Sequence, residues 1–212
     1  MTVSQSEYER SVFINCPFDA RYVPLFEAIV FTVYSCHFRP LSARERMNSG
    51  QIRLDKIVEL IGNARYSIHD LSRTETGGPY SLPRFNMPLE LGIALGCSRF
   101  GTGRQRNKSM LILDRRRYRY HKYISDIAGQ DISEHRDQPT RAIAAVRDWL
   151  RAESEMEDIA GADHIAERYG EFRRQLPHTC QVGDLNPKRL TFADYRWAIR
   201  EWLRNDEGAV SR

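Results

Sequence analysis

The sequence of 212 residues lacks the features that direct a chain into or across a membrane. No run approaches the roughly 18 consecutive uncharged, apolar residues of a membrane-spanning helix. The first ten residues are polar and include two glutamates, whereas a secretory signal begins with a basic segment and continues with an apolar one. We therefore expect a cytoplasmic protein that has no membrane partner.

Paired cysteines are also lacking. The four cysteines stand far apart, and no two of them have the spacing of a zinc site or a redox motif. Two acids in a glycine-containing turn, Asp126 and Asp131, do not have metal-site spacing either, so we predict no metal. Cys16 follows the first predicted strand and could serve a thiol hydrolase with His37 or His69 as its base. A small, reduced and buried thiol is the simpler interpretation.

A strong excess of one charge is absent as well, because the formal net charge is only +4. Basic residues gather at 104–108 and at 115–119, and tyrosines interleave the second group. A nucleic-acid-binding protein usually concentrates its positive charge on one continuous stripe. We interpret both groups as solvated loop charge, so nucleic acid is not an expected partner.

What the sequence does contain is an ordinary globular composition, with 41% hydrophobic and 28% charged residues. Strand and helix patterns alternate along it. Apolar runs predict strands at residues 11–15, 37–43, 65–71 and 108–114. Apolar residues at helical spacing predict helices at residues 22–36, 50–61, 86–97, 137–151, 159–176 and 192–203.

This alternation predicts an α/β fold with a doubly wound, mainly parallel sheet of the Rossmann-like or flavodoxin-like kind. We assign the α/β domain to residues 1–153 and a helical extension, which packs on it or on a partner, to residues 154–212. Ligands of such sheets bind outside the carboxyl ends of the strands. Function is therefore expected at residues 15–19, 69–84 and 114–119.

The extension is rich in aromatic residues. Tyr195, Trp197 and Trp202 lie too close together to form one simple helical stripe. We therefore expect some of them to pack on the α/β domain and others to lie in a self-association interface or against a protein partner.

Glu90 is the carboxylate with the most informative position. It lies between Leu89 and Leu91, near the start of a predicted helix that follows a long polar loop at 72–84. Burial would raise its pKa and the helix start would lower it. A structural alternative is that Glu90 only complements the helix N-terminus. Gly92 is expected to let the helix approach the sheet or a ligand closely, or to pack on a strand.

Three segments, VFINCPFD, YSIHDLS and FNMPLELGIALG, together resemble the superfamily that contains nucleoside 2-deoxyribosyltransferases and TIR-type NAD-cleaving domains. The likeness is one of pattern and spans residues 11–150. In these families a strand ends near an aspartate that is followed by Leu or Val and then by Ser or Thr, as at Asp70. A loop then leads to a helix with a Glu-Leu-Gly-x-Ala pattern, as at Glu90.

The resemblance implies that Glu90 attacks or stabilises the sugar C1′ while the N-glycosidic bond breaks. It also implies that Asp70 binds or protonates the leaving base, and that Asn15 and Phe18 line the base and ribose pocket. His69 points to the opposite face of its strand from Asp70, so we interpret it as structural. Further residues expected to bind substrate are Asp19, Asn86, which is also the expected helix cap, and the arginines Arg73 and Arg84. Together with Arg53, these arginines could bind the phosphates of a nucleotide.

The function implied by the resemblance is an N-glycosidase that hydrolyses NAD⁺ or a related nucleotide at the base–ribose bond, as an effector of bacterial defence against phage. The nucleotide is then a substrate, and no separate cofactor is expected. A homo-oligomer is expected because both families build their sites near subunit contacts. The alternatives are a nucleoside 2-deoxyribosyltransferase or nucleosidase, and a non-catalytic nucleotide sensor whose helical extension passes a signal to a partner.

Overall fold

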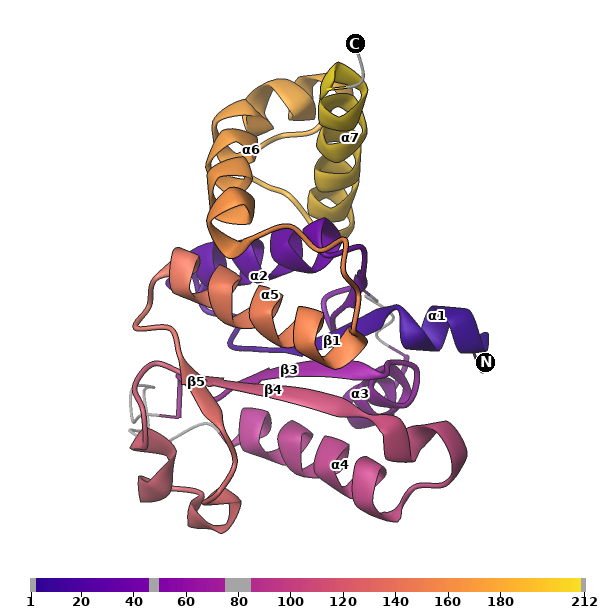
Figure 1. Ribbon diagram of the computed structural model, residues 1–212, viewed down its shortest axis with the longest axis vertical. Helices are drawn as coiled ribbons and strands as arrows, with labels where there is room; N and C mark the ends of the chain where they lie inside the picture. The colour runs from indigo at the N-terminus through magenta and orange to yellow at the C-terminus, as the bar shows by residue number, and fades with distance from the viewer. Residues whose placement is uncertain (1–2, 46–49, 75–84, 211–212) are drawn as a thin grey trace.

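The computed structural model describes residues 3–45, 50–74 and 85–210 (Figure 1). It contains a five-stranded sheet in the order β2-β1-β3-β4-β5, and every pair of neighbouring strands is parallel. The strands are β1 (Ser11–Asn15), β2 (Arg39–Leu41), β3 (Tyr66–Asp70), β4 (Ser109–Asp114) and β5 (Ile132–Glu134). The α/β fold with a parallel sheet is therefore confirmed, in the strand order of the flavodoxin-like class.

Helices cover both faces of the sheet, with α2 and α5 on one side and α3 and α4 on the other (Figure 1). The α-helices are α1 (Gln5–Glu9), α2 (Val23–Ser35), α3 (Arg53–Gly62), α4 (Asn86–Phe100), α5 (Pro139–Ser154), α6 (Ala162–Val182) and α7 (Phe192–Val210). Strand alternation explains the two layers. Val12 and Ile14 of β1 belong to the cluster that contains α2 and α5, whereas Phe13 packs with α3 residues.

Two elements were not predicted from the sequence, α1 and β5. The helix α1 is only five residues long, and it is held by a capping box in which Ser4 accepts from the Glu7 amide and Glu7 contacts the Ser4 amide. The strand β5 has three residues and no apolar alternation, since Ile132 is followed by a serine and a glutamate. Pairing with β4 therefore forms this strand, and local propensity does not.

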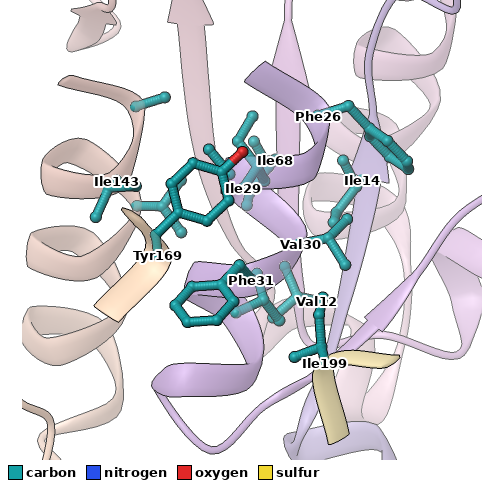
Figure 2. Close-up of a cluster of buried hydrophobic side chains, with 14 of the residues drawn as sticks. Val12, Ile14, Phe26, Ile29, Val30, Phe31, Ile68, Ile143, Tyr169 and Ile199 are labelled. Atoms are coloured by element: carbon teal, nitrogen blue, oxygen red, sulfur yellow. The ribbon is translucent and has the colours of Figure 1, made fainter. Parts of the chain in front are cut away.

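The helical extension continues the core of the sheet domain. The two C-terminal helices, α6 and α7, lie on the outer side of α2 and α5 (Figure 1). Phe31 of α2 is fully buried, and its ring centroid lies 5.2 Å from that of Phe172 and 5.9 Å from that of Trp202. Figure 2 shows Phe31 beside Tyr169 of α6, with Val12 of β1 and Ile199 of α7 in the same cluster. Residues distant in sequence thus share one apolar cluster.

The aromatic residues of α7 lie on two different faces of that helix. Tyr195 and Trp202 are 4% and 5% exposed and lie on the same buried face, because seven residues complete almost two helical turns. Trp197 lies off this face and packs its ring against Gly183, where a Cβ atom would lie 2.4 Å from the ring. The three residues therefore do not form one stripe, as predicted. The expected self-association interface stays a prediction.

Candidate active site at the carboxyl edge of the sheet

The candidate site lies where β1 and β3 end. Along the chain, β1 is followed by β2 on one side of it, whereas β3 on its other side leads to β4 and β5. This reversal is the topological switch point at which doubly wound sheets bind ligands. Asn15 and Asp70 are the last residues of the two strands. The first turn of α4 lies beside them, since the Asn15 side chain reaches the Met87 carbonyl.

Asn15 ties the two strands to the start of α4. Its side chain is buried, and Nδ2 lies 3.0 Å from His69 Nδ1 and donates to the Met87 carbonyl oxygen at 3.1 Å. His69 Nε2 in turn lies 3.0 Å from Ser67 Oγ. Burial lowers the pKa of His69 to about 3, so its ring is neutral and links the two strands. Among the described residues, Asn15 Oδ1 has no hydrogen-bond partner although it is buried.

Asp70 is fully buried, and both of its carboxylate oxygens accept hydrogen bonds. Its Oδ2 accepts from the Tyr22 hydroxyl at 2.5 Å, its Oδ1 accepts from the Ser72 amide at 2.8 Å, and His135 Nε2 lies 3.0 Å from Oδ2 without good hydrogen-bond alignment. Burial would raise the pKa of Asp70, but His135, the Ser72 amide and the Tyr22 hydroxyl hold that pKa below its usual value. Asp70 is therefore ionised at neutral pH and has no proton to give.

Glu90 is buried, but its carboxylate accepts no hydrogen bond from the described residues. The residues of α4 that face the sheet are Met87, Glu90, Leu91 and Ala94, at helical spacing. Glu90 is 5% exposed, whereas its neighbour Leu89 is 56% exposed. Burial raises the pKa of Glu90 to about 7, against the opposing effect of Arg53. In residues 3–45, 50–74 and 85–210, no hydrogen-bond donor or ion-pair partner contacts its carboxylate. Burial thus outweighs the helix start in setting this pKa.

The pKa of Cys16 shows that charged groups from both strand ends and from α4 lie near this residue. Burial, followed by the nearby Asp70, raises the pKa of the Cys16 thiol well above its usual value. Glu90 and Asp19 act in the same direction, and Arg44 acts in the opposite one. These groups therefore surround the end of β1. A buried thiol that is held neutral is not an activated nucleophile, which disfavours the thiol hydrolase alternative.

Arginines form the positive side of the site. The Arg44 guanidinium carbon lies 4.6 Å from the centre of the Phe18 ring and 4.9 Å from that of Phe26, and Nη2 donates to the Phe18 carbonyl at 3.2 Å. The Arg53 guanidinium carbon also lies near this ring, at 5.8 Å from its centre. Arg44 was not predicted from the sequence. Its place three residues after Leu41, the end of β2, is the signal that would have identified it.

The remaining predicted binding residues occupy different positions. Asp19 accepts from the Arg21 and Tyr22 amides before α2, and its Oδ2 lies 3.5 Å from Arg73 Nε. Asn86 is exposed and is the first residue of α4. The prediction that Asn86 caps this helix was wrong, because Phe85 occupies the cap position and makes no side-chain cap bond. The predicted substrate-binding roles of Asp19, Arg73 and Asn86 stay predictions.

Two further expectations concern α4 and the loop before it. Arg84 and most of the loop at 72–84 lie outside the described residues. Gly92 is exposed, and a Cβ atom placed on it would meet nothing within 4 Å. The expectation that Gly92 allows a close approach to the sheet was wrong, because this residue lies on the outer side of the helix.

A second polar cluster lies at the carboxyl end of β4. Buried Asp114 accepts from Arg119 Nε at 2.8 Å and from the Tyr123 hydroxyl at 3.0 Å. The Arg119 Nη2 atom also donates to the Leu71 carbonyl at 2.6 Å. Burial raises the pKa of Asp114, and its bonds to Arg119 and Tyr123 oppose that rise. Asp114 and Arg119, which lie in a segment predicted to be functional, thus hold β3 and β4 together.

The described part of the chain holds no group of three His, Cys, Asp or Glu residues placed to bind a metal ion. Within the same residues, no helix has both the length and the apolar character needed to cross a membrane. Comparisons with protein-family models, with curated proteins and with solved structures give no match. The function is therefore inferred from the geometry of the site.

Proposed function

We propose that the protein is an N-glycosidase that cleaves the bond between base and ribose in NAD⁺ or a related nucleotide, with Glu90 as the catalytic carboxylate. The observation that carries this proposal is the position of Glu90 at the switch point of the sheet, where it is buried, has no hydrogen-bond or ion-pair partner among the described residues, and has a pKa of about 7. Burying a carboxylate without a partner costs free energy, and such costs concentrate at functional sites.

In the proposed reaction, the ionised Glu90 stabilises positive charge at C1′ as the base departs with the bonding electron pair, or it attacks C1′ directly. Water then adds at C1′ and loses a proton to yield the free sugar hydroxyl; where Glu90 has bonded to C1′, that bond breaks in the same step and the Glu90 carboxylate leaves with its electron pair. A carboxylate in a low-dielectric site stabilises a developing cation more strongly than one in water does. Arg44 and Arg53 are placed beside Phe18, where their guanidinium groups suit phosphate oxygens.

The state of Asp70 favours NAD⁺ over neutral nucleosides. Nicotinamide leaves a cationic glycoside as a neutral molecule and needs no proton, whereas an ordinary nucleobase is a poor leaving group until it is protonated. Asp70 is ionised and enclosed by its donors, so in this proposal it positions the strand ends and does not serve as the acid. The transferase alternative, which acts on neutral nucleosides, has less support.

The test is chromatographic analysis of products after incubation of the purified protein with NAD⁺, NADP⁺, ATP, nucleosides and deoxynucleosides. We expect nicotinamide release from NAD⁺, reduced about a thousandfold in Glu90→Gln, which keeps the shape and removes the charge. The matched control is Glu9→Gln, which alters an exposed glutamate of α1. Equal release by wild type and Glu90→Gln would refute the role of Glu90. Ligand binding with no released base at any protein concentration would instead identify a sensor.

A further inference from the structure

A groove between the ends of β4 and β5 has no part in the proposed reaction. One section of it, with a volume of about 470 Å³, is lined by four arginines and two acids, namely Arg115, Arg116, Arg117, Arg136, Glu134 and Asp137. The adjoining section, of about 530 Å³, shares Arg117 and Glu134 with the first. Each volume lies within the range of small-molecule sites.

The arginines of this groove exceed the acids that could neutralise them. Arg115 Nε lies 2.6 Å from Asp137 Oδ2, and Arg136 Nε donates to Glu134 Oε1 at 2.9 Å. Arg116 and Arg117 are exposed, and in the described part of the chain no acid pairs with their guanidinium groups. Two guanidinium groups without acid partners at the mouth of one groove form a site for a phosphate-sized anion, which arginine binds through paired hydrogen bonds.

The second section supplies different chemistry. Tyr118 is 63% exposed and lines it together with Gln130, Asp131 and Ser133. An exposed aromatic ring offers a stacking surface for a nucleobase, and the amide, carboxylate and hydroxyl groups can bond to the edge of a base or to a sugar. Arg117 lines both sections and so joins the anion site to the stacking surface.

The backbone around the groove is held in place. The amides of His135 and Arg136 donate to the carbonyl oxygens of Asp114 and Arg115 at 3.0 and 3.1 Å, which continues the pairing of β4 and β5 beyond the strands. Tyr118 has a φ of 60°, a left-handed conformation that turns the chain after the arginines. Arg136 and Asp137, which also line the groove, have φ values of 52° and 57° in the same region, so two turns of this kind bring the groove residues together.

We propose that this groove is a second ligand site, for a nucleoside phosphate, in which Arg116 and Arg117 bind the phosphate oxygens and Tyr118 stacks on the base. The Asp114, Arg119 and Tyr123 cluster lies between the groove and the switch point, so the site does not depend on the reaction at Glu90. The acids in the groove, Asp131 and Glu134 among them, disfavour the backbone of a long nucleic acid and suit a small ligand.

The test measures binding of ADP and of pyrophosphate to the full chain by calorimetry at low salt. The double variant Arg116→Gln/Arg117→Gln should weaken both ligands about tenfold or more. Tyr118→Ala should weaken ADP about tenfold and leave pyrophosphate unchanged, because only ADP carries a base. The charge-matched control is Arg99→Gln/Arg200→Gln, two exposed arginines elsewhere, and it should change neither affinity.

Three results would overturn the proposal. The first is ADP affinity that is absent in wild type or unaffected by the double variant. The second is loss of ADP binding in Glu90→Gln, which would assign the ligand to the switch point. The third is binding of a single-stranded oligothymidylate more tightly than ADP, with a steep salt dependence and loss in the double variant, which would identify a nucleic-acid surface instead. Retained ADP binding in Glu90→Gln would support the proposal even if no base release is found.

Discussion

Asp70 and Glu90 are two buried carboxylates at the same edge of one sheet, and their surroundings differ sharply. Asp70 is 0% exposed and receives bonds from a tyrosine hydroxyl and a backbone amide, and these donors keep its pKa low. Glu90 is 5% exposed, receives no hydrogen bond from the part of the chain that the structure describes, and its pKa rises to about 7 against the opposing charge of Arg53. Burial alone therefore does not predict the protonation state of a carboxylate, because its donors decide the outcome.

The number of hydrogen-bond donors distinguishes a carboxylate that stabilises the fold from one that is available to act on a substrate. A satisfied carboxylate stabilises the folded state and is costly to replace. A buried carboxylate without donors destabilises the folded state and is free to act on a substrate cation. Substitutions at the two positions should therefore have opposite effects on stability.

The largest effect is expected for Asp70→Asn. An amide nitrogen in the place of Oδ2 cannot accept a hydrogen bond from the Tyr22 hydroxyl. It would also face the Nε2 atom of His135, a ring whose Nδ1 already accepts from the Asp137 amide. We expect a loss of about 3 kcal/mol in the free energy of unfolding, measured by urea denaturation. The control Asp148→Asn, on an exposed face of α5, should cost less than about 0.5 kcal/mol. A loss at Asp70 no larger than that of the control would contradict the structural role.

The next effect is a pH-dependent gain in stability for Glu90→Gln. The pKa of Glu90 is about 7 in the folded protein against 4.5 as its usual value, so from pH 4.5 to 7 only the unfolded chain releases the proton. The stability of wild type therefore falls across this window relative to the variant, and the difference levels off above pH 7. The full pKa difference corresponds to about 3.4 kcal/mol, at about 1.4 kcal/mol per pKa unit, and solvent screening through the residual exposure of Glu90 reduces the expected gain of the variant to about 2 kcal/mol.

Other buried groups contribute equally to the pH dependence of stability in Glu90→Gln and in wild type, so their contributions cancel in the comparison. His69, with a pKa of about 3 in the folded state and 6.5 as its usual value, makes both proteins more stable as pH rises to 6.5. Urea denaturation of both proteins at several pH values isolates the contribution of Glu90. A constant difference between pH 4.5 and 8 would show that its pKa is not raised.

A smaller effect is expected for Tyr22→Phe. This change removes one of the donors to Asp70 and keeps the buried ring, so the unfolding free energy should fall by about 1 kcal/mol. The pKa of Asp70 should also rise, and the stability lost on acidification should begin at a higher pH. Tyr118→Phe, on an exposed ring, is the control and should be neutral. If Tyr22→Phe and wild type lose stability at the same pH on acidification, the Tyr22 hydroxyl does not lower the pKa of Asp70.

The smallest effect is expected for Arg53→Gln. The positive charge of Arg53 lowers the pKa of Glu90, so its removal should move that pKa above 7. If ionised Glu90 performs the proposed cleavage, kcat/KM should rise with pH through a midpoint near 7 in wild type and through a higher midpoint in the variant. Arg99→Gln, which alters an exposed arginine of α4, the helix of Glu90, should leave the midpoint in place. A downward shift in Arg53→Gln would contradict the assignment.

The sequence predicted the strand of residues 11–15 with the observed bounds. The strong apolar run of β1 and the position of Asn15 at its end made this possible. It did not predict β5, which has no pattern of its own, or Arg44, which joins the site because β2 lies beside β1. Phe85 replaced Asn86 as the cap of α4, because a favourable cap residue is only a local preference.

By itself, the sequence determined the alternation of strands and helices, the parallel sheet and the placement of Glu90 on an apolar helix, because periodicity and local propensity are encoded in neighbouring residues. Only the tertiary structure decided which carboxylate acquired donors, since Tyr22 and His135 reach Asp70 from distant parts of the chain. The same holds for the groove between β4 and β5, whose arginines come from two separate segments. Protonation and charge at a site depend on neighbours in space, and folding alone brings those neighbours together.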